Sequence, residues 1–436
     1  MLQDGTTSLT AGDELGYLDK IRLFQKDAKL YIFSRVASTL GYGISNVIFN
    51  LYMIEVGFGE DFLGFFLSIS MFATAGIAIA AGMITDRRSR KRILLAASFV
   101  SFLSTAIRYT AIQPYILLFS QVMLGFSQAF TQVAMSPYVS DVSTEKERAH
   151  LFGFSGGMSL LAVLGGNILG GYIPGVLRGL GIAIDLLWSY RLTLWVSLIP
   201  IAISSLALLP MTPDEPQESE QRLGFANVRN WDFIGKYTIT TSTIGLGAGV
   251  IVLYFNLYFS SVFQVDEATI GLIFAINTIL LSVGQFSAPA LADRIGKVKT
   301  VIVTEALSIP FLLMLGWAPV LYIGVIAYVS RTVLMNMAGP VSNAFFMEGL
   351  TKKERATAVG ITRTGDSFVR GVAAIIGGWL LARGLYRVPY LLVSGLYLLG
   401  VLFFYTFFRG KEKELSAMRK AKIKREKEAP EAPDVT

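Results

Sequence analysis

The sequence contains no cysteine and a single histidine, His150, among its 436 residues. The absence of cysteine excludes disulfides, thiolate metal sites and thiol nucleophiles, and one histidine cannot build a multi-histidine metal centre. Charged residues are also scarce, at 16% of the chain against about 25% in soluble domains, whereas 53% of the residues are hydrophobic. The interior of a water-soluble fold of this length would not hold so much apolar surface. We therefore expect an integral membrane protein without metal or cofactor.

Three recognisable signals are missing as well. The chain has no Gly-x4-Gly-Lys-Ser/Thr phosphate loop, which argues against ATP as the direct energy source. It has no Asn-x-Ser/Thr glycosylation site, as is typical of a bacterial or archaeal plasma-membrane protein. Residues 1–27 are polar and lack the short apolar core of a secretory signal, so we expect the first membrane span to be retained.

Long apolar runs are present instead, separated by short polar breaks along the whole chain. A membrane-spanning helix needs about 20 mainly apolar residues, and the runs predict twelve such helices. The fold class expected is therefore an all-α integral membrane protein. The expected spans are 28–56, 61–84, 93–111, 114–140, 149–173, 189–210, 233–262, 267–292, 298–316, 319–347, 354–383 and 388–409.

Basic residues are concentrated in alternate connections between these spans. Clusters follow the second and the eighth span, and a third precedes the eleventh, whereas the connections after the first, third and seventh spans are acidic or neutral. Because cytoplasmic loops are enriched in Lys and Arg, we expect both termini, the linker 211–232 and the tail 410–436 to be cytoplasmic. The tail has eight basic and three acidic residues between 411 and 427, so it either lies on an anionic lipid surface or is solvated. The net charge of +7 thus reflects membrane orientation, and no nucleic acid partner is expected.

The two halves of the sequence repeat each other at an offset of 207 residues. Six spans in each half give both copies the same membrane orientation. The repeat therefore predicts two parallel six-helix bundles, 28–210 and 233–409, with a binding site between them. The matching positions are Asp86-Arg87 with Asp293-Arg294, Glu147-Arg148 with Glu354-Arg355, Gly64 with Gly271, Gly153 with Gly360, and Gly170-Gly171 with Gly377-Gly378.

The loop after the second span reads Gly82-x3-Asp86-Arg87-x-Ser89-Arg90-Lys91, and Asp293-Arg294-x-Gly296-Lys297 repeats part of it. These motifs resemble the loop signature of the major facilitator superfamily, with Ser89 where glycine is usual. The resemblance covers nearly the whole chain and implies a monomeric secondary transporter that works by alternating access. It also implies that charges at the inner helix ends latch the cytoplasmic side in the outward-open state; a topology signal with solvated charges is the alternative. The latch residues would be Asp86, Arg87, Arg90, Asp141, Arg148, Asp293, Arg294, Glu348 and Arg355.

Four ionisable residues are expected at membrane depth in the second half. Arg363, Asp366 and Arg370 share one face of the eleventh span, and Arg331 reaches a similar depth in the tenth. Because such charges are costly, they usually line an aqueous path or pair with one another. We expect Asp366 to titrate or exchange partners during transport, and an arginine to attract an anionic group of the solute. A static ion-pair cluster is the alternative.

Other polar residues are candidates for the wall of a central cavity. The family often has an arginine in its fourth helix that is associated with proton coupling, but Gln121 stands there, so coupling would rest on Asp366 or Glu305. Glu305 lies close to the inner end of its span and alternatively belongs to the cytoplasmic charge cluster. The remaining candidates are Asn46, Asn50, Gln128, Asn256 and Tyr258, and for each asparagine interhelical hydrogen bonding is the alternative.

The fifth span carries small residues at a spacing that resembles the antiporter motif of drug-exporting members, although close helix packing explains them equally. We expect a proton-coupled secondary transporter for a small organic solute, with drug export by proton antiport or uncoupled facilitation as alternatives. A membrane enzyme would need a nucleophile, a metal cluster or paired carboxylates, and a transporter-like receptor would need a sizeable signalling domain. The sequence shows neither such a catalytic site nor such a signalling domain, so no enzymatic activity is expected.

Overall fold

The computed structural model describes residues 24–85, 88–141, 145–212, 228–351, 354–411 and 414; the side chains of residues 136, 137, 140, 141 and 145–149 lie outside this description. Every regular element within these ranges is a helix. In chain order the helices are α2 (Lys26–Glu55), α3 (Glu60–Thr85), α4 (Arg90–Thr110), α5 (Pro114–Asp141), α6 (Glu145–Gly179), α7 (Leu186–Ala207), α8 (Trp231–Ile251), η2 (Val252–Tyr254), α9 (Phe255–Phe263), α10 (Glu267–Ile295), α11 (Lys297–Gly316), α12 (Leu321–Met337), α13 (Gly339–Glu348), α14 (Arg355–Leu381) and α15 (Val388–Phe408).

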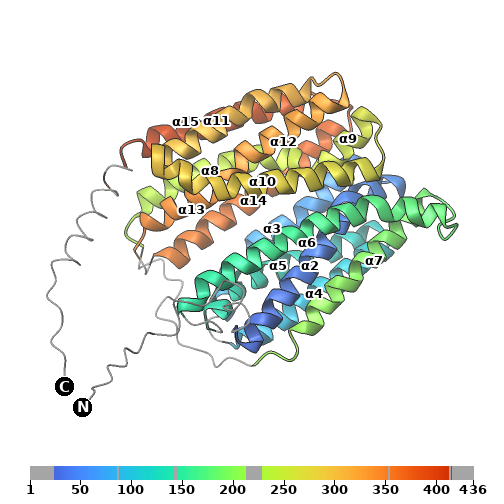
Figure 1. Cartoon of the computed structure of the whole chain (residues 1–436), viewed down its shortest axis with the longest axis horizontal. Helices are drawn as coiled ribbons and strands as arrows, with labels where there is room; N and C mark the ends of the chain where they lie inside the picture. Colours follow the sequence, from blue (N-terminus) through green and yellow to red (C-terminus); the bar gives the residue numbers. More distant parts are fainter. Residues whose placement is uncertain are drawn as a thin grey trace, which may run out of the picture.

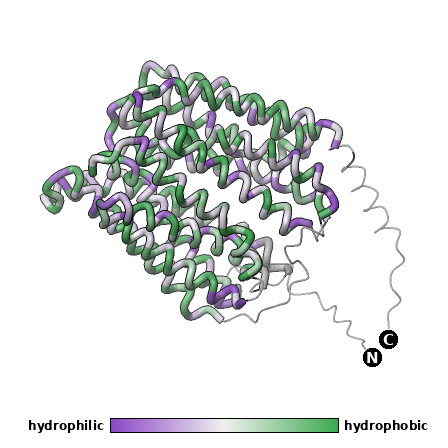
Figure 2. Tube along the Cα trace, turned by 180° about the vertical axis from the view of Figure 1, so that it is seen from behind, coloured by the Kyte–Doolittle hydropathy of each residue, from purple (hydrophilic) through white to green (hydrophobic). Residues whose placement is uncertain are grey.

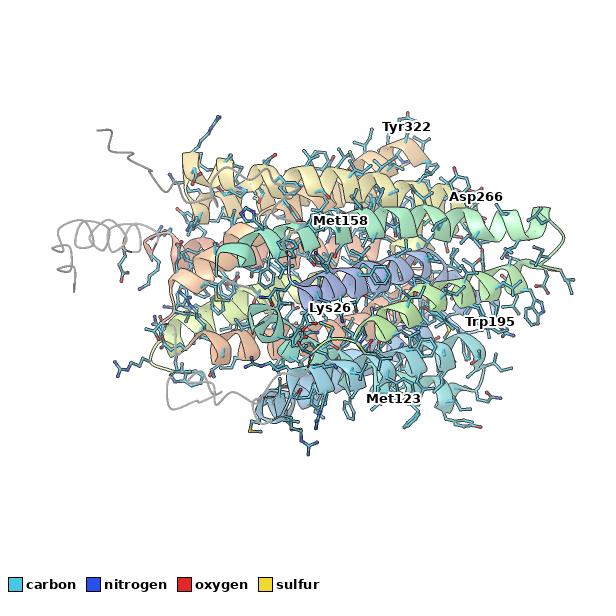
Figure 3. The ribbon with its side chains drawn as sticks, turned by 60° about the horizontal axis from the view of Figure 1, so that its bottom comes forward. Lys26, Met123, Met158, Trp195, Asp266 and Tyr322 are labelled. Carbon is cyan, nitrogen blue, oxygen red and sulfur yellow. The ribbon has the colours of Figure 1, made fainter. Side chains whose placement is uncertain are left out.

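The helices form two bundles that lie side by side, α2 to α7 in the first half of the chain and α8 to α15 in the second (Figure 1). The expected all-α fold with two helical repeats is thereby confirmed. We call the end at which α2 begins and α15 ends the terminal end, and the other the opposite end. Asp266 and Tyr322, which stand next to two loops of the opposite end, lie at the same end of the molecule in Figure 3.

Ten helical stretches in the described residues are long and apolar enough to cross a membrane. Helices α2 and α14 are also long, with 30 and 27 residues, but are not among the ten. They are packed centrally, α2 against α6 and α7, and α14 against α3 and α8. Large apolar side chains, among them Phe99, Phe119 and Phe286, are exposed, and hydrophobic residues run along the helices (Figure 2). Exposed apolar surface of this extent suits a lipid surrounding better than water.

Two pairs of glycines, the glycine contacts, join the halves near the opposite end. A Cβ atom on Gly378 of α14 would lie 2.9 Å from the Cα atom of Gly64 in α3. A Cβ atom on Gly271 of α10 would lie 3.0 Å from the Cα atom of Gly171 in α6. Helix backbones approach this closely only where no side chain intervenes. Because the offset of 207 residues relates one pair to the other, the sequence repeat is also a repeat of the interface between the halves.

The turns after α2 and α9 also correspond, but their residues differ. Gly57 has a φ of 104°, and Gln264, which stands 207 residues later, has a φ of 53°. A positive φ costs little for glycine and more for glutamine, and the Gln264 amide donates to the Ser261 carbonyl at 2.7 Å. Asp266 then caps α10 by accepting the Thr269 N–H at 3.0 Å. Hydrogen bonds from the Thr269 side chain and backbone hold the pKa of the Asp266 carboxyl below its usual value.

Candidate functional site

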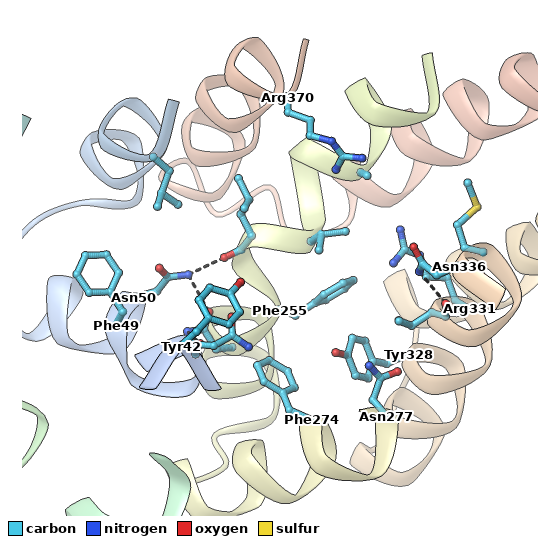
Figure 4. Close-up of a pocket in the computed structure, with 18 of the residues that line it drawn as sticks. Tyr42, Phe49, Asn50, Phe255, Phe274, Asn277, Tyr328, Arg331, Asn336 and Arg370 are labelled. Atoms are coloured by element: carbon cyan, nitrogen blue, oxygen red, sulfur yellow. Dashed lines mark hydrogen bonds between the residues drawn. The ribbon is translucent and has the colours of Figure 1, made fainter. Parts of the chain in front are cut away.

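A cavity of about 440 Å³ lies between the two halves (Figure 4). Seven of its lining residues come from α2, α3 and α4 in the first half, and sixteen come from the second half. Figure 4 shows Asn50 and Phe49 on one side of the cavity and Arg331 and Tyr328 on the other. The second half therefore supplies most of the polar and aromatic groups that a bound molecule would contact.

Arg331 of α12 is the most deeply buried charge on the cavity wall, with 1% of its surface exposed. Its guanidinium lies over the rings of Phe255 and Tyr397, 5.6 and 5.4 Å from their centroids, and donates to the Tyr397 hydroxyl. Cation–π contacts of this kind stabilise a desolvated cation by about 2 kcal/mol. Within the described residues no carboxylate lies within 4 Å of Arg331, and its Nε atom has no hydrogen-bond partner in the protein.

Three further buried polar groups of the second half line the same cavity without a protein partner. They are Oε2 of Glu305 on α11, Oδ1 of Asn277 on α10 and Oγ1 of Thr332 on α12. Each residue is about nine-tenths buried. Buried polar atoms are nearly always hydrogen-bonded in native proteins, so this concentration of unpartnered atoms points to a binding surface. Glu305 thus lies on the cavity wall, whereas its place in the sequence also suggested the charge cluster at the inner helix ends.

The charges expected on α14 occupy two different environments. Arg370 lines the cavity and donates through Nε to Asp366 Oδ2 at 2.8 Å. Asp366 itself is turned toward α8, where a Cβ atom on Gly245 would clash with its Oδ1. Arg363 is exposed, and neither Asp366 nor Arg363 lines the cavity. The structure therefore separates the four expected charges into an Asp366–Arg370 pair, a lone Arg331 and an exposed Arg363.

The first half contributes one charge that the sequence interpretation missed. Arg108 of α4 lines the cavity and lies over Phe49 and Tyr109, with 4.8 and 5.0 Å to the ring centroids. Its Nη2 donates to the Tyr109 hydroxyl at 3.1 Å, while Nε has no partner. Arg108 stands two residues before the end of α4 and was not among the predicted site residues. An arginine beside a tyrosine in an apolar run is the signal that was available.

Asn50 and Asn256, expected as cavity residues or interhelical bonding residues, do both. The Asn50 amide donates to Asn256 Oδ1 at 2.9 Å and to the Leu253 carbonyl at 2.6 Å. The Asn256 amide donates to the Val47 and Asn46 carbonyls at 3.0 and 3.4 Å. All three asparagines line the cavity. Leu253 belongs to η2, where the seventh span leaves α-helical geometry, so Asn50 satisfies a carbonyl that the break exposes.

Tyr258, Gln121 and Gln128 lie away from the cavity wall. The Tyr258 hydroxyl donates to the Leu315 carbonyl at 2.5 Å, and Tyr52, 206 residues earlier, donates to the Tyr109 carbonyl at 3.5 Å. This correspondence assigns Tyr258 a packing contact that both halves share. Gln121 is buried with both amide atoms unpartnered, whereas Gln128 is exposed, so these two residues of α5 occupy different environments.

At the terminal end, the structure places only part of the expected latch. Lys297 of α11 and Glu348 of α13 pair at 2.5 Å within the second half. Their counterparts 207 residues earlier are Arg90, which is buried, and Asp141. Asp293, Arg294 and Arg355 are exposed. Asp86 and Arg87 lie outside the described residues, as do the side chains of Asp141 and Arg148, residues 213–227 of the linker and residues 415–436 of the tail.

The ion pair that joins the two halves in the described residues stands at the opposite end. Arg178 Nη2 of α6 lies 3.4 Å from Glu267 Oε2 of α10, which is buried. This pair stands beside the contact between Gly171 and Gly271. The opposite end is therefore closed by backbone contact, by the amides of Asn50 and Asn256, and by one ion pair.

Two curated relatives match parts of the chain. Sugar transport protein MST7 of Oryza sativa subsp. japonica is 23% identical over 184 residues, which is 41% of this chain and 34% of the relative. Multidrug resistance protein 2 of Bacillus subtilis (strain 168) is 24% identical over 180 residues, 41% of this chain and 44% of the relative. The chain thus aligns with less than half the length of each.

Likeness of fold extends further than likeness of sequence. The solved structure of a variant of the nucleoside transporter NupG superposes with a TM-score of 0.70 over 88% of this chain and 100% of that one, at 14% identity. The sequence model of the Major Facilitator Superfamily matches residues 31–238 and again residues 237–431, one match for each bundle. These findings and the two apolar bundles point to a transporter rather than an enzyme, and the chain belongs to the Major Facilitator Superfamily of membrane transporters.

Proposed function

We propose that the protein is a proton-coupled secondary transporter that carries a small polar organic solute by alternating access. The cavity of about 440 Å³ is within the size range of small-molecule sites, about 300–1,000 Å³. It lies between the two halves, as expected for parallel-repeat transporters. Its wall combines amides, tyrosines and arginines, which suit a polar solute better than a lipophilic one.

The closed opposite end supports an inward-facing state. The halves touch there through the glycine contacts and the Arg178–Glu267 pair. At the terminal end, the described residues contain no ion pair between the halves. Because basic loops gather at the terminal end, we assign that end to the cytoplasm. Rocking of the two halves would then open the opposite end and bring the latch charges together.

Glu305 is the observation that carries the proposal of proton coupling. Its carboxyl group is buried in the cavity wall, and Oε2 has no partner. Burying an isolated carboxylate costs far more than burying a neutral carboxyl group. A carboxyl in this position therefore favours loading of a proton before the cavity closes and release when water reaches it. Asp366 is less suited to this role because Arg370 already neutralises it at 2.8 Å.

Drug export is the second candidate, since one relative is a multidrug resistance protein. The small residues of α6 that resemble the antiporter motif have packing roles in this structure. Cβ atoms on Gly166 and Gly170 would lie 2.5 Å from the Leu40 and Ile44 carbonyls of α2. Asn167, where the motif has proline, donates to the Thr278 hydroxyl across the two halves at 3.4 Å. These contacts account for the spacing without a drug site.

Transport by proteoliposomes that contain a trapped pH-sensitive dye tests the proposal. Glucose, uridine, gluconate and the lipophilic cation tetraphenylphosphonium are added in turn, and proton movement is recorded. We expect one polar solute to drive proton movement in the wild type. In Glu305→Gln that movement should stop, whereas exchange of labelled for unlabelled solute should continue. Glu55→Gln, at the exposed end of α2, is the matched control.

Three results would overturn parts of this proposal. Solute movement without proton movement in the wild type would make the protein an uncoupled facilitator. Proton movement driven only by tetraphenylphosphonium would favour drug export. Unchanged proton movement in Glu305→Gln would remove Glu305 from the coupling step.

A further inference from the structure

We propose that Arg331 and the unpartnered groups beside it form a subsite for the carboxylate of a small hydroxylated organic acid. This inference rests on the proposed transport function and names its substrate class. It would make the second half the substrate-recognising half.

Arg331 has the features of an anion-binding residue that lacks only its anion. The guanidinium is buried and lies over the aromatic rings of Phe255 and Tyr397. The Tyr397 hydroxyl fixes one end of the guanidinium, and Nε–H remains without a protein acceptor. A planar guanidinium binds carboxylate oxygens through two parallel N–H groups, and such pairs are strongest where water is excluded.

The balance of charge around the cavity also favours an anion. Arg108, Arg331 and Arg370 line the cavity, whereas Glu305 is its one acidic lining residue among those described. Asp366 neutralises Arg370. Arg108 and Arg331 therefore outweigh Glu305, and the excess is greater when Glu305 carries the coupling proton. A monoanionic solute would restore neutrality when Glu305 is ionised and would reduce the excess from two charges to one when Glu305 is protonated; uncompensated charge is costly in a site of low dielectric constant.

The other unpartnered atoms indicate what the rest of the solute must offer. Asn277 Oδ1 accepts hydrogen bonds, Glu305 Oε2 accepts them when it is ionised, and Thr332 Oγ1 both accepts and donates. A solute whose carbon skeleton bears hydroxyl groups would satisfy these atoms, while a purely aliphatic acid would leave them unpaired. Phe274 and Tyr328 also line the cavity and offer apolar faces to that skeleton. The chemistry of the site therefore matches a hydroxy acid.

Thermal unfolding of the full chain in phosphatidylcholine nanodiscs tests the subsite, since these lipids provide no anionic headgroup as competitor. The probes are paired so that only the acidic group differs: gluconate with sorbitol, glycerate with glycerol, and quinate with its methyl ester. We expect at least one carboxylate, and not its uncharged partner, to raise the unfolding temperature of the wild type. In Arg331→Gln the apparent dissociation constant should rise about 30-fold or more.

Two variants separate loss of binding from loss of folding. Arg331→Lys retains the charge but not the paired N–H groups, so it should bind the same carboxylate more weakly than the wild type and more tightly than Arg331→Gln. Tyr397→Phe keeps the ring and removes the hydroxyl that orients Arg331, so we expect a smaller loss. Arg387→Gln, at an exposed arginine outside the cavity wall and the expected latch, should bind as the wild type does.

The subsite is refuted if no carboxylate stabilises the protein, if each uncharged partner stabilises it equally, or if Arg331→Gln binds normally. Proton movement coupled to an uncharged solute would refute the subsite and leave the transport function intact. Absence of any solute movement for acids and uncharged compounds alike would count against the proposed function itself.

Discussion

The two halves share their packing contacts but differ in the charged residues that line the cavity. The glycine contacts, the tyrosines that bond to carbonyls of the next but one helix, and the reciprocal amides of Asn50 and Asn256 all follow the sequence repeat. The cavity charges do not, because Arg331, Glu305 and Arg370 of the second half correspond by position to Leu124, Ser98 and Val163. Symmetric positions thus hold the interface, and asymmetric positions supply the site.

The polar residues of α6 and α14 show the same divergence in more detail. Asp366 corresponds to Ser159, which accepts a hydrogen bond from Arg35 Nε at 3.2 Å. Arg35 in turn corresponds to Ser242, whose hydroxyl lies near Gly365. The first half therefore has a basic residue on α2 facing a neutral one on α6, whereas the matching positions of the second half hold a neutral residue on α8 and an acidic one on α14. The charge of this helix pair thus differs between the halves while the backbone arrangement is shared.

The largest effect is expected from changes that break the shared packing. Gly378→Val and Gly271→Val each place a side chain against a facing backbone, so each should disfavour closure of the opposite end. An overpacking cost of about 1–3 kcal/mol predicts a loss of transport of about 5- to 150-fold. Distances between spin labels on introduced cysteines would report the closure.

Gly76→Val is the matched control, because a Cβ atom there would have no neighbour within 4 Å. If the repeat governs the interface, the two contact variants should behave alike. If the opposite end closed in one contact variant and stayed open in the other, the two glycine contacts would not be equivalent.

A double-mutant cycle on Asn50 and Asn256 sharpens the same comparison. Asn50→Ala or Asn256→Ala alone removes the hydrogen bond between the two amides and the bonds that the replaced amide donates to backbone carbonyls, and should lower the free energy of unfolding by about 2 kcal/mol. The double variant should cost less than the sum, because the bond between Asn50 and Asn256 is lost only once. Chemical unfolding in detergent measures all four proteins, and strict additivity would show that the two amides act independently.

Glu354 anchors the start of α14 at the terminal end. Burial opposes its ionisation, but hydrogen bonds from Thr351 and from the Arg229 and Asn230 N–H groups outweigh burial and lower its pKa to about 2. The stability that the ionised carboxyl contributes is complete above pH 4.5, its ordinary pKa, and is lost as the pH falls toward 2. We expect Glu354→Gln to destabilise the protein by about 2 kcal/mol at neutral pH and to flatten this acid dependence.

Glu147 occupies the corresponding position in the first half. Unfolding temperatures recorded from pH 3 to pH 7 for Glu147→Gln and Glu354→Gln would decide whether the anchor is repeated. Equal changes in unfolding temperature would show that both halves have this anchor at the terminal end. No change in Glu147→Gln would show that only the second half has it.

The smallest effect is expected at the Arg178–Glu267 pair. Arg178 is 40% exposed, so Arg178→Gln should shift the equilibrium between open and closed states by about 1 kcal/mol or less. The equivalent positions are Leu385 and Glu60, where no pair can form. We expect Leu385→Arg to compensate for Arg178→Gln in spin-label distances at the opposite end, and no recovery would show that the asymmetry is required.

The repeat and the apolar runs allowed the fold to be predicted because both properties are local in sequence. The offset that matched Gly64 to Gly271 and Gly171 to Gly378 also relates the two glycine contacts, but which of these backbones touch was seen only in the structure. Glu305 and Arg331 could be proposed as site residues because ionisable groups are rare in apolar runs. Their surroundings could not be predicted, because Tyr397 and Asn277 reach the cavity from helices whose rotation depends on packing across the bundle.

Arg108 was missed for a different reason. Depth along a span is a poor guide where a helix end is covered by neighbouring helices, and Phe49 and Tyr109 cover this one. Tyr258 shows the converse, because its helix faces the cavity while its own side chain turns to Leu315. Sequence periodicity therefore indicates the helix but not the direction of each side chain.

The glycine contacts lie far from the terminal end, so a small tilt at the contacts produces a large displacement at that end. From Gly64 to the terminal end of α3 at Thr85 there are 21 residues, or about 31 Å of helix at 1.5 Å per residue. A tilt of about 10° at the contact would displace the terminal end by about 5 Å over that length. A small tilt at the glycine contacts is thus enough to admit or release a molecule at the terminal end.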